Sequence, residues 1–224
     1  MYLSGINSTK MSLEKDKEIE NYILSHIDEE SDLLKQLNRD AHVNLLKPRM
    51  LSGHLQGRML KMFCRMVQPR YILEIGTYTA YATLCMAEGA PENAEIHTIE
   101  LNDELEDFIL KYLDKSKLKN NIHLHIGDAM EIIPTLECTF DLVFIDANKR
   151  HYIEYYDLIY NKVRPGGLII ADNTLWDGHV LETPKSSDKQ TIGIQAFNDM
   201  IAKDDRVEKV ILPVRDGLTL IWKK

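Results

Sequence analysis

The segment from Tyr71 to Leu84 restricts the possible folds of this chain more than any other. Residues 71–75 form a short, mostly apolar run, Gly76 interrupts it, and a helical pattern begins directly afterwards. A run of this kind, followed by glycine and a helix, predicts a buried strand, a tight turn and a helix N-terminus. In a doubly wound sheet a nucleotide-like ligand binds beside such a junction, because the crevice lies beyond the carboxyl ends of the strands.

The rest of the chain continues the alternation of strands and helices. Strands are predicted at residues 71–75, 95–99, 122–126, 142–145 and 168–171, and helices at 12–46, 54–66, 102–113, 152–163 and 192–202. The last segment predicts a hairpin of residues 207–212 and 218–222. Parallel strands that alternate with helices form a sheet covered on both faces. We therefore expect a Rossmann-like α/β fold, a doubly wound, mostly parallel seven-stranded sheet with an antiparallel C-terminal hairpin.

The length of the chain, 224 residues, suits one large α/β domain. We expect a single domain over residues 1–224, in which residues 1–47 form an N-terminal helical extension or lid. The three cysteines are odd in number and form no CxxC pair, which indicates reduced thiols in a cytoplasmic protein. No apolar run reaches the roughly 18 residues of a membrane span, and residues 10–20 are too densely charged for a signal peptide.

An acidic side chain stands at or just after the end of every predicted parallel strand. These acids are Glu74, Glu100, Asp128, Asp146 and Asp172. A single acid at such a position most often caps a helix or closes a turn. Parallel strands, however, deliver their carboxyl ends to one edge of a sheet, so acids in register are expected to converge on one crevice.

The turn after the first strand has too few glycines for a dinucleotide. A pyrophosphate site requires G-x-G-x-x-G, whereas only Gly76 is present here, and Glu74 beside the turn would repel a phosphate. A phosphate-free adenosyl ligand fits better, with Glu100 on the ribose hydroxyls and Asp128 on the adenine amino group. S-adenosylmethionine has these features, and an NAD-dependent oxidoreductase is the disfavoured alternative.

Asp146, Asp172 and Asn173 form a second group, delivered by the ends of neighbouring strands. Three oxygen donors without cysteine or histidine suit Mg²⁺, Mn²⁺ or Ca²⁺ rather than Zn²⁺. Lys149 lies about one helical turn after Asp146, so its amine is a candidate general base at the same place. The alternative for Lys149 is a surface lysine in an ion pair.

Short motifs spread from Pro48 to Lys224 carry a family resemblance. They are Leu73-Glu74-Ile75-Gly76-Thr77, Ile99-Glu100, Gly127-Asp128-Ala129, Phe144-Ile145-Asp146-Ala147-Asn148-Lys149, Arg164-Pro165-Gly166-Gly167, Ala171-Asp172-Asn173 and Leu212-Pro213-Val214-Arg215-Asp216-Gly217-Leu218. With these motifs in this order, the chain resembles the cation-dependent class I O-methyltransferases of the catechol and caffeoyl-CoA type, in which they occur in the same order. Any one motif is weak, but together they are highly specific.

The resemblance implies roles for particular residues. Asp146, Asp172 and Asn173 match the divalent-metal ligands, and Lys149 matches the catalytic base, which acts beside Asp146. The positions that match the S-adenosylmethionine site are Ser52, Glu74, Gly76, Thr77, Tyr78, Glu100, Ala129, Asp146 and Asn148.

Two positions depart from the family pattern. Ala80 stands where the family usually has glycine, and Ala82 stands at a cofactor-binding position where it usually has serine. Losing the serine removes one hydrogen bond to the methionine part of the cofactor, worth about 0.5–1.5 kcal/mol.

The implied reaction is methyl transfer to a phenolic hydroxyl of a small vicinal diol of the catechol or caffeoyl type. The cation would bind two neighbouring acceptor oxygens beside Asn173, and Lys149 would accept the proton. Trp176, directly after the metal motif, is expected either as a wall of the substrate site or as a buried core residue. The substrate-side acid of the catechol enzymes has no clear match near Val210.

Other functions stay open at this point. Some relatives methylate 5-hydroxyuridine in tRNA, and a local basic cluster would suit nucleic acid, although the net charge of −8 disfavours it. That cluster consists of Lys47, Arg49, Arg58, Lys61, Arg65 and Arg70. A binder that keeps the fold without turnover is a further alternative, against which the intact metal and lysine set argues. By analogy with the caffeoyl-CoA type, we expect a homodimer.

Overall fold

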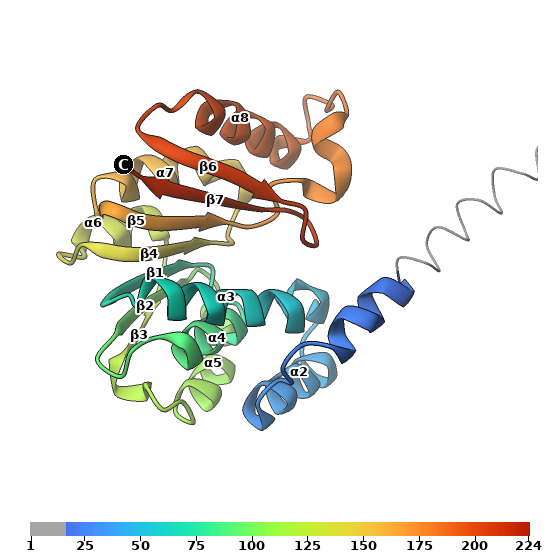
Figure 1. Ribbon diagram of the computed structural model, residues 1–224, viewed down its shortest axis with the longest axis vertical. Helices are drawn as coiled ribbons and strands as arrows, with labels where there is room; N and C mark the ends of the chain where they lie inside the picture. Colours follow the sequence, from blue (N-terminus) through green and yellow to red (C-terminus); the bar gives the residue numbers. More distant parts are fainter. Residues whose placement is uncertain (1–16) are drawn as a thin grey trace, which may run out of the picture.

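The computed structural model describes residues 17–224 and contains a seven-stranded sheet in the order β3-β2-β1-β4-β5-β7-β6 (Figure 1). Neighbours from β3 to β5 are parallel, whereas β7 runs antiparallel to both β5 and β6. The predicted doubly wound sheet with an antiparallel C-terminal hairpin is confirmed. The strands are β1 (Tyr71–Ile75), β2 (Glu95–Glu100), β3 (Ile122–Ile126), β4 (Phe140–Ile145), β5 (Val163–Ala171), β6 (Val207–Leu212) and β7 (Leu218–Lys223).

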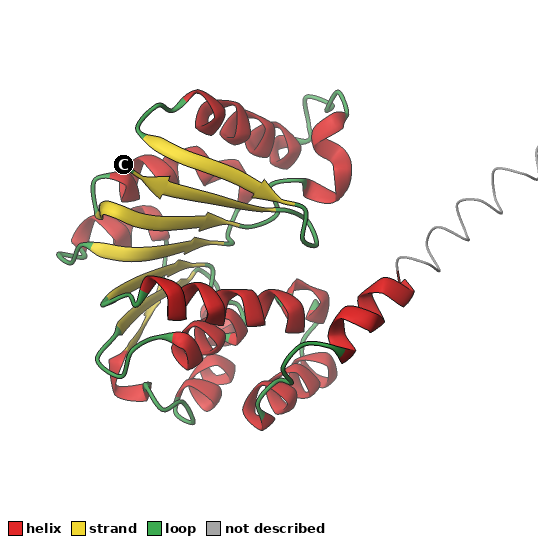
Figure 2. Ribbon diagram, viewed as in Figure 1, coloured by secondary structure: helices red, strands yellow, loops and turns green. Residues whose placement is uncertain are grey.

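Helices cover both faces of the sheet (Figure 2). On one face lie α2 (Asp32–Asn44), α3 (Gly53–Val67), α4 (Tyr81–Gly89) and α5 (Glu106–Leu113). On the other face lie α6 (Ala129–Thr135), α7 (Tyr152–Tyr160) and α8 (Lys189–Lys203). Short 3-10 turns occur at Pro48–Met50, Asp103–Leu105, Lys119–Asn121, Lys149–His151 and Trp176–Leu181.

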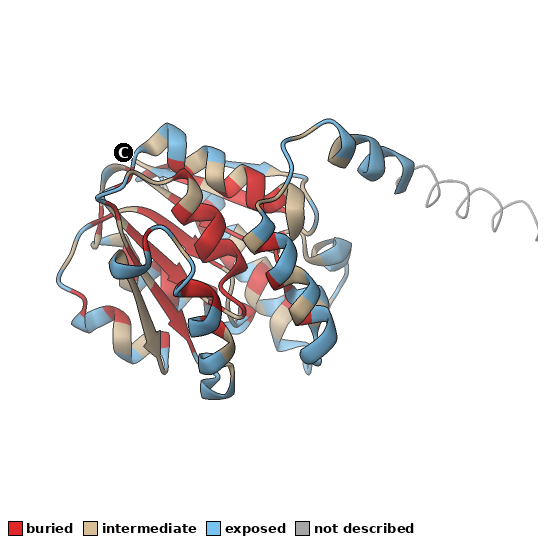
Figure 3. Ribbon diagram, turned by 90° about the horizontal axis from the view of Figure 1, so that it is seen from below, coloured by how far each residue is buried: buried red, intermediate tan, exposed pale blue. Residues whose placement is uncertain are grey.

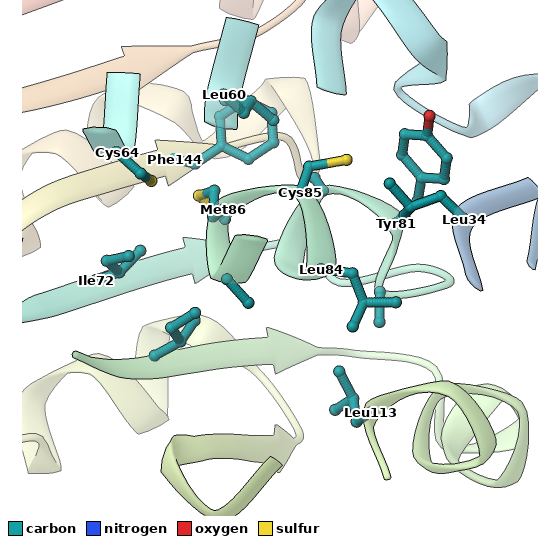
Figure 4. Close-up of a cluster of buried hydrophobic side chains, with 14 of the residues drawn as sticks. Leu34, Leu60, Cys64, Ile72, Tyr81, Leu84, Cys85, Met86, Leu113 and Phe144 are labelled. Carbon is teal, nitrogen blue, oxygen red and sulfur yellow. The ribbon is translucent and has the colours of Figure 1, made fainter. Parts of the chain in front are cut away.

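The core forms two apolar layers, one on each face of the sheet, and the buried residues concentrate on the strands and the helix surfaces against them (Figure 3). Figure 4 shows part of one layer, in which Leu60 of α3, Ile72 of β1 and Phe144 of β4 gather around α4. Each fully buried Leu, Ile or Phe side chain contributes about 1.5–3 kcal/mol relative to an exposed one. The packing therefore fixes the strands against the helices.

Side chains alternate between these layers along β1. Ile72 belongs to the layer of α3 and α4, whereas Leu73 and Ile75 belong to the layer of α6 and α7. Glu74 has the same parity as Ile72, so its side chain points beneath α4. Its hydrogen bond from Thr83 of α4 agrees with this direction.

The order of the sheet reverses at β1, which pairs with β2 on one side and with β4 on the other. Ile75, the last residue of β1, lies opposite both Ile99 and Ile145. The three strands therefore end at the same edge of the sheet. In an open α/β sheet, this switch point is where a ligand crevice forms.

The predicted continuous helix over residues 12–46 is wrong in its middle, and residues 12–16 lie outside the described part of the chain. The chain is helical at 17–25, leaves the helix over 26–31 and resumes as α2. Ser31 explains the restart, because its side chain accepts a hydrogen bond from the Leu34 amide and so caps α2. Helix α2 then packs on α4 through residues such as Leu34 and Leu37. The lid role of residues 1–47 stays a prediction.

Two further boundaries differ from the prediction. Helix α6 was not predicted, because its segment is short and contains Pro134. Asp128 caps this helix by accepting a hydrogen bond from Met130 N at 2.9 Å. Helix α7 ends at Tyr160, and Val163, predicted as the helix end, begins β5 instead. Within residues 17–224, no helix is both long enough and apolar enough to cross a membrane.

Candidate active site

Gly76 opens the turn after β1 with a φ of 101°. A Cβ at this position would lie 2.1 Å from the backbone oxygen of Asp146, so both conformation and space require glycine. Tyr78 and Ala80, with φ of 50° and 66°, are also left-handed. This conformation costs a residue with a side chain about 1–2 kcal/mol. The departure at Ala80 therefore falls at a position that favours glycine.

Glu100, at the end of β2, organises the same turn. Its carboxylate accepts hydrogen bonds from Tyr78 N at 2.7 Å and from Asn102 N at 2.9 Å. The amides of Gly76 and Thr77 both donate to the backbone oxygen of Ile99. The turn is thus tied to β2 at three backbone amides, and Glu100 is held with 8% of its surface exposed.

A cavity of about 750 Å³ lies beyond the carboxyl ends of the strands. Small-molecule sites typically measure about 300–1,000 Å³. The segment 47–52, the turn after β1 and the residues that follow β2, β3, β4 and β5 form its wall. The predicted site residues that line it are Ser52, Gly76, Tyr78, Glu100, Asp128, Ala129, Asp146, Asn148, Lys149, Asp172, Asn173 and Trp176.

Three residues predicted to bind the cofactor, Glu74, Thr77 and Ala82, lie behind this wall and not in it. Glu74 is fully buried, and its Oε2 accepts hydrogen bonds from Thr83 and, at 2.6 Å, from Thr98. Its Oε1 has no hydrogen-bond partner among the described residues. Burial raises the pKa of Glu74 to about 8, so the carboxyl is mostly protonated at neutral pH. Its side chain is part of the packing beneath α4.

Asp146 and Asp172 are brought together by the pairing of β4 with β5. Ile145 lies opposite Ala171, so the residue after each strand reaches the same point. Asn173 follows Asp172 in a left-handed conformation with a φ of 57°. Its backbone N–H donates a hydrogen bond to Asp172 Oδ1 at 2.7 Å. The structure therefore gathers the three oxygen-bearing side chains predicted from sequence at one wall of the cavity.

The electrostatics of this wall favour a cation. Asp172 is 3% exposed, and burial together with the charge of Asp146 raises the pKa of Asp172 to about 7. Lys149 donates from Nζ to Asp146 Oδ1 at 2.7 Å and lies 5.5 Å from the centre of the Tyr152 ring. One lysine beside two carboxylates leaves excess negative charge in a poorly solvated crevice, which a divalent cation would offset.

A second cavity, of about 620 Å³, adjoins the first. Both are lined by Arg150, Trp176, Gln190 and Asp216. Trp176 is partly exposed with a φ of 48°, and the backbone of the adjacent Asp177 is left-handed as well. Trp176 thus contributes to the walls of both cavities. This wall residue also packs against the core layer of α6 and α7, so its role in substrate binding stays a prediction.

The comparison with known proteins gives the family. The model of the family described as O-methyltransferase matches residues 24–224. This chain belongs to the O-methyltransferase family. It is 32% identical over 222 residues to caffeoyl-CoA O-methyltransferase 2 of Zea mays, covering 93% of this chain and 84% of the relative. It is also 32% identical over 212 residues to catechol O-methyltransferase of Niastella koreensis, covering 90% and 95%.

A solved structure agrees with this assignment. The O-methyltransferase TomG from Streptomyces achromogenes, determined in complex with SAM, matches with a TM-score of 0.85 at 28% identity, over 92% of this chain and 96% of that one. The family resemblance inferred from the motifs is confirmed, and the chain is an enzyme of the O-methyltransferase family.

The site of this O-methyltransferase includes residues that the sequence did not single out. Gln56 of α3 is 1% exposed and donates from Nε2 to Asp172 Oδ2 at 2.6 Å. Its only signal in the sequence is a polar residue on an otherwise apolar helix face, in line with Leu60 and Cys64. Beyond the predicted site residues, the large cavity is lined by Lys47, Arg49, Met50, Leu51, Ile75, Ile99, Leu101, Gly127, Ala147, Arg150, Tyr155, Gln190, Arg215 and Asp216.

The basic cluster of residues 47–70 is not one surface patch in the O-methyltransferase fold. Arg58 and Lys61 both pair with Glu88, at 3.1 and 2.9 Å. Lys47 and Arg49 instead line the large cavity. Arg70 pairs with Glu95 at 2.8 Å, so the charges predicted as a possible nucleic-acid surface include three ion-paired residues and two that line the cavity.

Proposed function

We propose that this enzyme transfers a methyl group from S-adenosylmethionine to a hydroxyl of a vicinal-diol phenol of the catechol or caffeoyl type, with the help of a divalent cation. The observation that carries the proposal is the group of Asp146, Lys149, Asp172 and Asn173 on one wall of a cavity that continues beyond Trp176. The names of the relatives, caffeoyl-CoA and catechol O-methyltransferase, support the acceptor class.

S-adenosylmethionine fits the turn after β1 better than a phosphate-bearing cofactor does. Glu100 lies at the wall with its carboxylate fixed by two amides, and a carboxylate so placed suits the hydroxyls of a ribose. Asp128 Oδ1 is used by the cap of α6, which leaves Oδ2 for the adenine amino group. TomG, solved with SAM, has the same fold.

A divalent cation fits the donors of the other wall. Asp146, Asp172 and Asn173 offer carboxylate and amide oxygens, which Mg²⁺, Mn²⁺ and Ca²⁺ prefer. Burial and the charge of Asp146 raise the pKa of Asp172 even though Lys149 pairs with Asp146, and a divalent cation at this wall would offset the remaining negative charge. Gln56 holds Oδ2 of Asp172, so the carboxylate has one fixed orientation.

When bound, S-adenosylmethionine would supply an electrophilic methyl group on its sulfonium sulfur. The divalent cation would supply a Lewis acid that orients the acceptor oxygens and lowers the pKa of the acceptor hydroxyl. The chain supplies position and a proton acceptor. Lys149 Nζ takes the proton of the acceptor hydroxyl, while Asp146 fixes the amine at 2.7 Å. The acceptor oxygen, once deprotonated, would accept the methyl group that the sulfonium of the bound cofactor supplies. Trp176 and the other cavity walls would restrict how the acceptor binds beside Lys149.

Methyl incorporation from labelled cofactor tests the proposal. Phenolic vicinal diols and bulk tRNA serve as acceptors, with Mg²⁺ and with EDTA followed by Mg²⁺. Lys149→Ala is expected to reduce turnover of the diol about 10²–10⁴-fold while the affinity for S-adenosylmethionine stays the same. The matched control, Lys162→Ala, removes a lysine that contacts the backbone oxygen of Leu136 far from the cavity wall. Undiminished activity in EDTA or in Lys149→Ala would refute the mechanism.

Methyl incorporation into bulk tRNA tests the alternative that the acceptor is a nucleic acid. The pairing of Arg58 and Lys61 with Glu88 disfavours this alternative, because these two charges are already neutralised. The homodimer is likewise a proposal from the family analogy, for which light scattering on the purified chain is the measurement. Cytoplasmic location agrees with the three unpaired cysteines, Cys64, Cys85 and Cys138, and is tested by localising a tagged chain.

A further inference from the structure

Strands β2 and β3 carry a cluster of imidazole side chains away from the large cavity. Glu95 and His97 lie on β2, and His123 and His125 lie on β3, with His97 directly opposite His123. Alternate residues of a strand share a face, so all four side chains lie on the same face of the sheet. The ring centres of His97 and His123 are 4.8 Å apart, and those of His97 and His125 are 5.3 Å apart.

We propose that Glu95, His97 and His123 bind one transition-metal ion of the Zn²⁺ type. One ligand atom of each residue lies within 4.8 Å of the other two. The distance from His123 Nε2 to Glu95 Oε2 is 3.8 Å. Ligand atoms on tetrahedral zinc lie about 3.3 Å apart, given bonds of about 2.0–2.1 Å. The His123–Glu95 pair therefore has to close by about half an ångström, and no pair of ligand atoms has to close by more than about 1.5 Å.

The neighbouring groups prepare these ligands for a metal. His97 Nδ1 lies 3.1 Å from His125 Nε2, and with the hydrogen on Nδ1 the Nε2 of His97 is left with its lone pair free. Arg70 pairs with Oε1 of Glu95 at 2.8 Å, which fixes the carboxylate and leaves Oε2 for the ion.

The ligand chemistry separates this site from the wall of the large cavity. Two imidazoles and one carboxylate form the kind of set that binds Zn²⁺ with a water in the fourth position, whereas an all-oxygen set prefers Mg²⁺. Side chains of His123 and Glu95 are 42% and 31% exposed, so an ion can enter from solvent. None of the three ligands lines the large cavity. The ion would join β3, the outermost strand, to β2 (Figure 1).

Titration calorimetry of Zn²⁺ into the full-length, tag-free chain tests this inference, with Mg²⁺ in excess. One Zn²⁺ per chain is expected, with an affinity reduced at least tenfold in His97→Ala and in His123→Ala. His42→Ala, which removes an exposed histidine of α2, is the matched control and is expected to bind as the wild type does. Glu95→Gln keeps the shape of the side chain and is expected to weaken binding as well.

Two further measurements separate the possible outcomes. Zn²⁺ is expected to raise the midpoint of thermal unfolding of the wild type but not of His123→Ala, because the ion joins two strands only when the chain is folded. Binding is also expected to persist in Asp172→Asn. Loss of the Zn²⁺ signal in Asp172→Asn would place the ion at the cavity wall instead and overturn the proposal. Equal affinity in the wild type, His97→Ala and His123→Ala, or no binding at all, would overturn it too.

Discussion

Replacing Glu74 by glutamine is expected to change how the stability of the protein depends on pH. The pKa of the buried carboxyl is about 8 in the folded protein, against an ordinary value of 4.5. A raised pKa means that the folded state holds the proton more tightly than the unfolded state does. The carboxyl therefore contributes its full stability below pH 4.5 and loses it as the pH rises to about 8.

The magnitude follows from the two pKa values. Each pH unit between them changes the free energy of unfolding by about 1.4 kcal/mol, so the loss amounts to about 4–5 kcal/mol over the whole interval. Glutamine keeps the shape and the acceptor for Thr83 and Thr98 but cannot ionise. The free energy of unfolding of Glu74→Gln should therefore rise relative to the wild type as the pH increases through this interval.

Urea unfolding at a series of pH values from about 5 to about 8 measures this difference. Glu131→Gln, at an exposed position of α6, is the control and should follow the wild type at every pH. Comparing variants cancels the titration of all other groups, including Asp172. If Glu74→Gln and the wild type gave parallel curves, Glu74 would be ionised in the folded protein and the account of its burial would be wrong.

Two further substitutions test the geometry of the cavity. Gln56→Leu should raise the Mg²⁺ concentration needed for half-maximal activity about 10–100-fold, because Asp172 loses the hydrogen-bond donor that orients its carboxylate. An unchanged Mg²⁺ requirement would contradict this role of Gln56. Gly76→Ala should lower the free energy of unfolding by about 3 kcal/mol or more, since its Cβ meets the Asp146 backbone. Gly178→Ala, with a φ of 81° but open space around it, should cost only about 1 kcal/mol, and equal losses in urea unfolding would argue against the clash.

Much of the fold follows from local patterns in the sequence. The strand predicted at residues 71–75 matches β1 because an apolar run bounded by turn residues has few alternatives, and the strand predicted at 122–126 matches β3, in which isoleucine or leucine alternates with histidine. The break at 26–31 escaped prediction because the apolar spacing continues across it, and only Ser31 marks the new helix start. Helix α6 escaped because one turn around Pro134 carries almost no periodicity.

The candidate site was predictable where it depends on strand ends. Asp146 and Asp172 meet because the register of β4 and β5 places them together, and strand order alone suffices for that inference. Gln56 reaches Asp172 across 116 residues of sequence, a contact that only the packing of α3 on the sheet reveals. Glu74 points away from the cavity because side chains alternate along β1, which places Glu74 on the same face as Ile72, beneath α4.

The turn after β1 carries its own anion. In proteins that hold a pyrophosphate at this junction, free backbone amides face the ligand. Here the amide of Tyr78 donates to the carboxylate of Glu100, and those of Gly76 and Thr77 donate to the Ile99 backbone oxygen. An incoming phosphate would have to displace Glu100 and then remain beside its negative charge. The fold thus already uses the amides of Gly76, Thr77 and Tyr78, three donors that a phosphate at this turn would otherwise contact.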